Sequence, residues 1–338
     1  MSFITEACTK IQQSLLPVAG LNGPISRSRT GFIDALISPV NRNGFQAVPL
    51  STNGVYRTVR LQYLPQGGLS DILTSKPDVC VAGDVPEPLG QDVNVTLERY
   101  WKKTMNINDF REFCTWNIKQ HRNWMFQSLI NPLIQSINRA LMTQWLTKYG
   151  AYYNQGVPAS KTFNLLTTAT PVAADYYEWS KILDEYNKLR GIGSPIIVGD
   201  GLMNSFMRMI QIGCCNDNGI DLSRAAGDAF FFYDIDASTI LGANKFAMWS
   251  PGALQYINYL EYVGDFAINK ESTVKRVIED PFTGIAMDFQ IYEDDCAENV
   301  TFVVGTKFDL YALPLTMYKV GDPMEAVNGS VLGTAAQA

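Results

Sequence analysis

Residues that usually carry catalysis are scarce in this chain. His121 is the only histidine, and it falls within a segment of helical periodicity, where a lone histidine is more often packed or partly exposed than a ligand or base. No HExxH, P-loop, GxSxG or zinc-type Cys/His spacing occurs. The sequence therefore predicts neither an enzyme nor a bound cofactor.

One turn stands where nucleotide-binding loops are found. Gly199-Asp200-Gly201 follows a short apolar strand and precedes a helix, but the third glycine of the phosphate-binding fingerprint is missing. A tight strand-to-helix turn explains the two glycines better. An enzyme would need a small-molecule pocket here and a carboxylate pair among Asp228, Asp234 and Asp236, and this alternative stays open.

The acidic clusters and the cysteines do not indicate a metal site. If Gly219 takes position six of a calcium loop, Ala225 falls at position twelve, where the loop needs a bidentate acid. Glu293-Asp294-Asp295 ends a predicted strand and is typical of a solvated turn. The six cysteines include no CxxC pair, which favours reduced thiols. We expect no bound metal.

The charge balance limits the possible partners. The net charge is −6, which lacks the basic excess typical of sequence-specific nucleic-acid binders but allows a protein to enclose nucleic acid. Only 18% of the residues are charged, which hints at subunit contacts because interface centres are poor in charge. We expect no secretory signal and no membrane span, since no apolar stretch reaches about 18 residues.

Residues 1–50 are apolar but irregular. Glycine and proline recur too densely for a helix or strand period. Apolar side chains such as Phe32, Ile33 and Leu36 are nevertheless too numerous for a solvated tail. We expect an extended arm that lies on its own body or on a neighbour.

A hairpin with a long tip is predicted next. Val55–Tyr63 and Val93–Tyr100 alternate in polarity as strands do, and a stretch rich in glycine and proline separates them. A two-stranded arm is only marginally stable by itself, so we expect it to rest on a partner.

The strongest helical pattern runs from Asn108 to Tyr149 and ends at Gly150. Pro132 interrupts it, so either a long helix kinks there or a second helix starts with Asn131 as its cap. Both interpretations give a rod on the order of 40–60 Å, at about 1.5 Å per residue.

The remaining segments predict a mixed fold. Residues 171–211 have the pattern of a helix, a short buried strand and a second helix, and residues 320–338 that of a small-residue tail. Further strands are predicted at Phe230–Tyr233, Lys245–Trp249, Thr273–Glu279, Ile285–Tyr292 and Val300–Leu313.

This order of elements resembles the major capsid proteins of tailed phages, an α+β fold of the Hong Kong ninety-seven type that encapsulins share. Short phrases add to the resemblance, at Ser194–Gly199, Leu241–Lys245, Ser250–Leu254 and Asp280–Gly284. The resemblance implies an N-terminal arm at 1–50, an extended loop at 51–104, a peripheral domain with a spine helix at 105–169, an axial domain at 170–272, and returning peripheral strands with a C-terminal tail at 273–338.

The resemblance also implies a function. The chain would be a coat subunit of the virion, assembled in the host bacterial cytoplasm into hexameric and pentameric capsomers of an icosahedral shell that encloses double-stranded DNA without sequence-specific binding. A portal would be a partner. Because no charged helical extension precedes the arm, the resemblance implies a separate scaffolding protein as a further partner, or none. The alternatives are an encapsulin-like compartment, another tail or baseplate protein, and an enzyme.

Six residues are candidates for contacts between subunits in such a shell. Arg57, Arg60 and Arg99 of the hairpin are expected to form intersubunit ion pairs. The apolar side chains of Phe32, Ile33 and Leu36 are expected to anchor the arm. If so, deleting residues 1–45 should leave a soluble protein that forms no shells.

Overall fold

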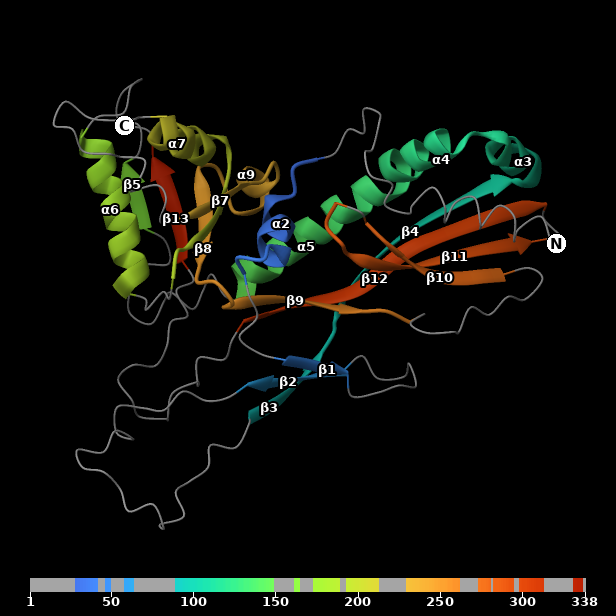
Figure 1. Ribbon diagram of the computed structural model, residues 1–338, viewed down its shortest axis with the longest axis horizontal. Helices are drawn as coiled ribbons and strands as arrows, with labels where there is room; N and C mark the ends of the chain where they lie inside the picture. The colour runs from blue at the N-terminus through green and yellow to red at the C-terminus, as the bar shows by residue number, and fades with distance from the viewer. Residues whose placement is uncertain are drawn as a thin grey trace, which may run out of the picture. The chain divides into compact units, whose positions relative to one another are not determined.

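The computed structural model (Figure 1) contains two compact units. Unit 1 comprises Met1–Arg29, Val95–Ala140 and Ile257–Asp309, and unit 2 comprises Thr30–Asn94, Leu141–Tyr256 and Leu310–Ala338. The structure describes residues 28–41, 46–49, 58–63, 89–148, 161–164, 173–188, 193–212, 229–261, 273–280, 282–294, 298–312 and 331–336.

The predicted hairpin is confirmed, with a third strand added. Strands β2 (Thr58–Tyr63) and β3 (Leu89–Asn94) pair antiparallel, from Thr58 opposite Asn94 to Tyr63 opposite Leu89. Strand β1 (Gln46–Pro49) pairs with β2 and completes a three-stranded sheet. Part of the predicted arm is therefore regular structure, because three paired strands are more stable than two.

The second predicted strand of the hairpin is wrong in its extent. The chain leaves β3 at Val95, which is buried, and starts β4 (Leu97–Asn106) in a different sheet. Thr96 fixes this change because its backbone N–H and its hydroxyl both donate to the Asp309 carboxylate, at 3.1 and 2.9 Å. The polarity alternates without a break from Val93 to Glu98, but tertiary contacts place the two ends of this run in different sheets.

The sheet of unit 1 confirms the predicted strands of the last third. Its order is β10 (Thr273–Glu279), β11 (Ala286–Asp294), β12 (Asn299–Ala312) and β4, and all these pairs are antiparallel. Strand β9 (Leu254–Tyr259) also pairs with β12. The turn between β10 and β11 is held by the Asp280 carboxylate, which accepts the N–H and hydroxyl of Thr283.

The predicted rod is divided into shorter helices. Helix α3 (Ile107–Thr115) ends before α4 (Ile118–Met125), because Asn117 and Gln120 form a capping box. The Gln120 N–H donates to Asn117 Oδ1 at 2.9 Å, and the Asn117 N–H donates to Gln120 Oε1 at 3.0 Å. Two orphan backbone donors are thereby satisfied at the start of α4.

At Pro132 the helix continues through a π-turn, which neither sequence interpretation anticipated. The π-turn, η2 (Phe126–Ile130), leads directly into α5 (Asn131–Lys148). Asn131 has helical dihedral angles, φ −58° and ψ −52°, and its N–H donates to the Phe126 carbonyl. It is therefore not a cap, and the wider turn accommodates a proline that lacks a backbone donor.

The helices of unit 1 cover one face of its sheet (Figure 1). Alternate residues of β12, namely Val300, Phe302 and Val304, are fully buried. The Phe302 ring lies 5.3 Å from the Phe110 ring of α3 and 6.2 Å from the Trp124 ring of α4. This period-two burial is the pattern of a sheet with one covered face.

The sheet of unit 2 shows that the C-terminal tail was wrongly predicted. Its order is β5 (Lys161–Asn164), β13 (Val331–Ala336), β8 (Lys245–Trp249), β6 (Ile196–Gly199) and β7 (Phe230–Tyr233). Strand β13 lies inside this sheet, paired with β5 and β8. Small residues suit this position, because a Cβ on Gly333 would come within 2.1 Å of the Phe246 ring.

The predicted helix–strand–helix segment is confirmed as α6 (Ala173–Lys188), β6 and α7 (Gly201–Ile212). Helices α6 and α7 share one apolar cluster with the sheet, and its largest members are Trp179, Tyr186, Phe206 and Phe246. A short helix, α9 (Ala237–Ile240), follows β7. No helix in the described part of the chain is long and apolar enough to cross a membrane.

A helix also forms where the sequence predicted an irregular arm. Helix α2 (Gly31–Ile37) buries the Phe32 ring 5.3 Å from the Trp249 ring and 6.3 Å from the Trp145 ring. Gly31 allows the close approach, because a Cβ there would lie 2.4 Å from the Tyr233 carbonyl oxygen. Tertiary burial stabilises a helix too short to form by itself.

Replacing Gly31 with alanine should therefore destabilise the protein. The added methyl group would meet rigid backbone atoms, so we expect a loss of about 1–3 kcal/mol in the free energy of unfolding, measured by urea denaturation. Gly201→Ala is the matched control, since a Cβ there meets nothing within 4 Å. Equal stability of the two variants would contradict the packing described for α2.

Candidate functional site

The turn at Gly199-Asp200-Gly201 has a structural role. Asp200 Oδ1 accepts the Leu202 N–H at 3.2 Å, and Oδ2 accepts the Asn244 N–H at 2.9 Å. A Cβ on Gly199 would lie 2.9 Å from Met203 Cβ, so the first glycine is needed for packing. The carboxylate caps α7, and the prediction of a tight strand-to-helix turn is confirmed.

Asp234 and Asp236 also serve the fold. Asp234 is fully buried, and its Oδ2 accepts the Phe32 N–H at 2.9 Å while its Oδ1 accepts the Asp236 N–H at 2.8 Å. The carboxylate thus stands at the N-terminus of α2, where unpaired N–H groups and the helix dipole favour negative charge. Asp228 lies outside the described residues. The predicted carboxylate pair has no support in this arrangement.

His121 is packed, as the sequence suggested. Its side chain is buried in α4, and Nδ1 lies 3.2 Å from the Asn117 carbonyl oxygen. Across the ranges that the structure describes, no group of three or more His, Cys, Asp or Glu side chains is arranged to hold a metal ion.

The predicted apolar anchors are placed differently from the expectation. Phe32 and Ile33 have no exposed surface, and Leu36 is 5% exposed, all within the core of unit 2. A buried side chain has no surface to offer to a neighbouring subunit. These residues therefore anchor α2 to its own chain, and the intersubunit role assigned to them is corrected.

The three arginines have different positions. Arg57 lies outside the described residues. Arg60 is on β2, where its backbone stands opposite Asp92 of β3. Arg99 is on β4 and not on the hairpin, and its guanidinium donates to the Glu98 carbonyl oxygen at 2.9 Å. The structure does not bring Arg60 and Arg99 into one sheet.

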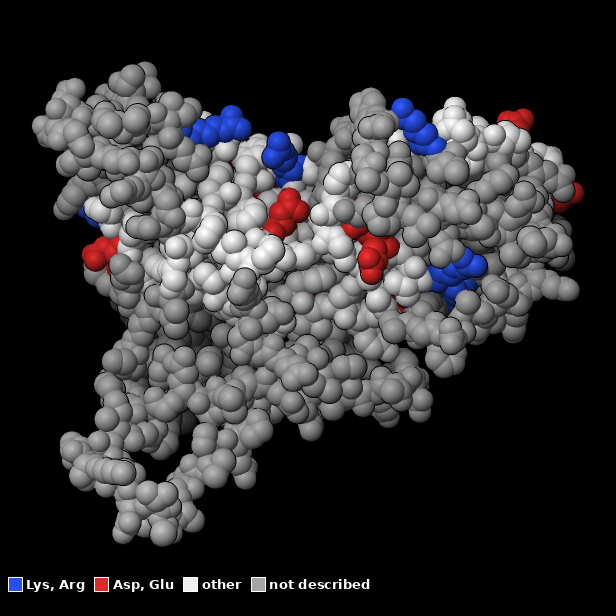
Figure 2. Space-filling model, viewed as in Figure 1, with Lys and Arg blue, Asp and Glu red and all other residues white. Residues whose placement is uncertain are grey.

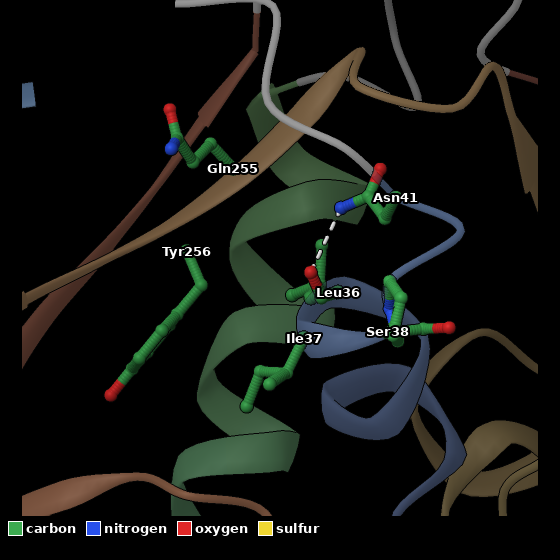
Figure 3. A pocket seen from close by; sticks show the side chains of 7 residues that line it. Leu36, Ile37, Ser38, Asn41, Gln255 and Tyr256 are labelled. Carbon is green, nitrogen blue, oxygen red and sulfur yellow. Dashed lines mark hydrogen bonds between the residues drawn. The ribbon is translucent and has the colours of Figure 1, made fainter. Parts of the chain in front are cut away.

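A pocket of about 410 Å³ lies between the end of α2 and the start of β9 (Figure 3). The Asn41 amide nitrogen donates to the carbonyl oxygens of Leu36 and Leu254, both at 2.9 Å. Burial raises the pKa of Tyr256, so its hydroxyl stays protonated near neutral pH. No charged side chain is among the lining residues, which are Leu36, Ile37, Ser38, Pro39, Asn41, Gln255 and Tyr256. The pocket offers no acid, base or activated nucleophile.

Exposed apolar side chains are the surface features that sequence reasoning missed. In unit 1, Tyr100, Trp116, Phe282 and Tyr292 are each between 41% and 47% exposed. In unit 2, Ile235 at the end of β7 is 50% exposed. Aromatic side chains are enriched at protein interfaces. Strand alternation could have identified Tyr100 and Tyr292 only if the covered face of the sheet had been known.

Charged side chains are scattered over the surface seen in Figure 2, where lysine, arginine and acidic residues of the described part stand apart from one another. The described residues on this face form no continuous basic patch of the kind that sequence-specific nucleic-acid binders carry. This distribution agrees with the low charged fraction of the sequence.

The fold has clear counterparts among solved structures. No protein-family model matches the chain, and no curated protein matches its sequence. The chain is similar to a structure described as "Cyanophage A-1(L) capsid asymmetric unit", with 12% identity, a TM-score of 0.55, and coverage of 96% of this chain and 98% of that chain.

Two further similar structures come from mycobacteriophages. One, from Mycobacterium phage Adephagia, has 9% identity and a TM-score of 0.47, with 98% of this chain and 97% of that chain covered. The other, from Mycobacterium phage Che8, has 11% identity and a TM-score of 0.43, with 87% and 93% covered. The cyanophage match, with its TM-score of 0.55, confirms the predicted α+β phage capsid fold.

Asp234→Asn should separate a structural role from a catalytic one. An amide has one acceptor oxygen for the two N–H donors, so one buried donor loses its partner, at a cost of about 1–3 kcal/mol in unfolding free energy. Asp184→Asn on α6 is the control, since that side chain is exposed; it should change stability by under about 0.5 kcal/mol. Unchanged stability of Asp234→Asn would contradict the helix-capping role.

Proposed function

We propose that a chain with this fold is a major capsid protein, which assembles with copies of itself into the closed shell around the double-stranded DNA of a phage. The observation that carries the proposal is the match to a capsid asymmetric unit over 96% of this chain and 98% of that chain. The match extends over nearly the whole of both chains, so the likeness includes the complete subunit and not one domain of it.

The side chains at the candidate catalytic positions support a structural role. Asp200 and Asp234 both use their carboxylate oxygens to fix turns and helix ends. The pocket beside α2 has no charged lining residue. Large apolar side chains such as Tyr100 and Trp116 remain exposed instead, as expected where a subunit meets its neighbours.

Shell assembly follows from repetition of weak contacts. Each contact stabilises the shell by about a few kcal/mol, and closed symmetry repeats it many times. We assign hexameric and pentameric capsomers to this chain, with a portal and a separate scaffolding protein as partners. On the same proposal, residues 51–94 with the sheet β1–β2–β3 form the extended loop that reaches a neighbour.

Removing residues 1–27 tests the arm more cleanly than removing residues 1–45. The longer deletion would take away α2 and expose the core around Trp249, so it would unfold unit 2 whatever the arm does. We expect the shorter variant to keep its thermal unfolding midpoint and to form no closed shells, because the apolar segment around Leu15 and Leu16 is lost.

Negative-stain microscopy of the full chain and of the shorter variant measures this result. Closed shells from the full chain support the proposed function. Tubes would indicate a tail protein, and discrete particles smaller than a pentameric or hexameric capsomer would contradict a shell subunit. Normal shells from the variant would refute the role given to the arm while leaving the capsid function in place.

The arginines of the extended loop should affect assembly but not folding. We expect the double variant Arg57→Gln, Arg60→Gln to assemble at least about tenfold more slowly. A loss of about 1.4 kcal/mol in the free energy of the contact between subunits corresponds to a factor of ten. Glutamine is preferable to glutamate, because an acid at position 60 would face Asp92 across the strand pair. Light scattering follows assembly, with Lys181→Gln on α6 as control; equal rates would refute the role of these arginines.

A further inference from the structure

One long segment of the chain contains no acidic residue. The protein has 33 aspartates and glutamates in 338 residues, about one in ten, yet residues 113–174 contain none. The charged residues of that segment are all cations, namely Lys119, Arg122, Arg139, Lys148 and Lys161. All charged side chains of this segment are therefore positive, although the protein as a whole has a net charge of −6.

The segment includes α4, the π-turn η2 and α5. Helix α4, η2 and the N-terminal part of α5 lie along the sheet of unit 1 (Figure 1). The side of these helices away from the core carries one line of residues, with Lys119 beside it. The members of this solvent stripe within unit 1 are Gln120, Asn123, Gln127, Pro132, Ser136 and Arg139.

The π-turn keeps the solvent stripe continuous. Successive members are three or four residues apart, as in an α-helix, except between Gln127 and Pro132, where the step is five. That step spans the π-turn at Phe126–Ile130, whose hydrogen bonds join residues five apart. On the buried side the steps remain three or four residues, through Met125, Leu129 and Leu133, so the step of five occurs only on the solvent side.

The chemistry of the solvent stripe suits phosphate groups. Lysine and arginine supply positive charge, and the amides of glutamine and asparagine and the hydroxyl of serine donate hydrogen bonds to phosphate oxygens. Gln120, Gln127 and Arg139 are exposed. Because the segment itself contains no acid, none of its own side chains would repel a polyanion along this line.

We propose that this solvent stripe contacts the phosphate backbone of the double-stranded DNA inside the shell. The proposal rests on the capsid function proposed above and adds the surface of the subunit that faces the DNA. The contact is sequence-independent, since cations and amides on a helix surface that bind phosphates read no bases. It is also weak for one subunit, because the negative net charge of the rest of the chain opposes it.

Salt dependence of DNA binding tests the proposal. The variant Lys119→Gln, Arg139→Gln removes two cations with a residue that favours helices. Each lost phosphate contact reduces the magnitude of the slope of log affinity against log salt by about 0.9, so two reduce it by about 1.8. Fluorescence anisotropy with a labelled DNA duplex and the unassembled full chain measures the slope.

A second double variant is the matched control. Lys181→Gln, Arg208→Gln also removes two cations, both of them exposed and on α6 and α7. We expect this control to keep the slope of the unaltered chain to within about 0.9, the value of a single contact. Poly-glutamate serves as a second labelled probe and should bind more weakly than the duplex and without dependence on the solvent stripe.

Three outcomes would overturn the inference. They are an equal loss of slope in the control variant, equal stripe-dependent binding of poly-glutamate, and no DNA binding by a chain that forms closed shells in the microscope. The last result leaves the capsid function intact, whereas an unaltered chain that forms neither shells nor capsomers refutes that function directly. Retained shell formation by the stripe variant, together with a reduced slope, supports DNA contact.

Discussion

Strand β12 is the element on which unit 1 depends, because β11, β4 and β9 all pair with it. Its register places Val300, Phe302 and Val304 toward the helices, and a slip by one residue would turn all of them to the other face. Gly305 fixes the register further. A Cβ there would lie 2.4 Å from the Arg99 carbonyl oxygen and 2.2 Å from the Tyr100 ring, so only glycine fits opposite Tyr100.

The C-terminal half of β12 is buried despite its polar residues, and each has a partner. Thr306 donates to Asn258 Oδ1 at 2.5 Å, Lys307 pairs with Glu261, and Asp309 accepts from Thr96. Buried polar groups are tolerated only when they are satisfied in this way. In unit 2 the same principle acts through Asp234, which compensates the N-terminus of α2. In both units, buried acidic side chains thus stabilise the fold.

This use of buried acids explains why the fold carries no evident catalytic centre among its described residues. A reactive carboxylate needs an oxygen directed at a substrate, whereas the oxygens of Asp200 and Asp234 accept backbone N–H groups. A subunit that functions by assembly needs something else, namely rigid units with exposed apolar side chains and a suitable charge pattern. On the proposed capsid function, the exposed aromatic residues would serve contacts between subunits and the acid-free helical segment would serve the contact with DNA.

The sequence by itself determined the elements whose signals are local. Periodicity identified α6, α7 and strands β10 to β12, and the absence of motifs correctly gave structural roles to Gly199–Gly201 and His121. Element order then led to the capsid fold, since that order is unusual. The Asn117–Gln120 capping box was missed, although an N-cap residue followed three positions later by glutamine is present in the sequence.

The tertiary structure alone decided where strands pair and which apolar residues are buried. The sequence of β4 does not show that it pairs with β12, and the sequence of β13 does not show that it enters the sheet of unit 2. In both cases the pairing partners lie far away in the sequence. The same holds for Phe32, whose burial depends on Trp145, Trp249 and the Asp234 carboxylate. Local patterns record the propensity of a segment, but long-range contacts decide which partner stabilises it.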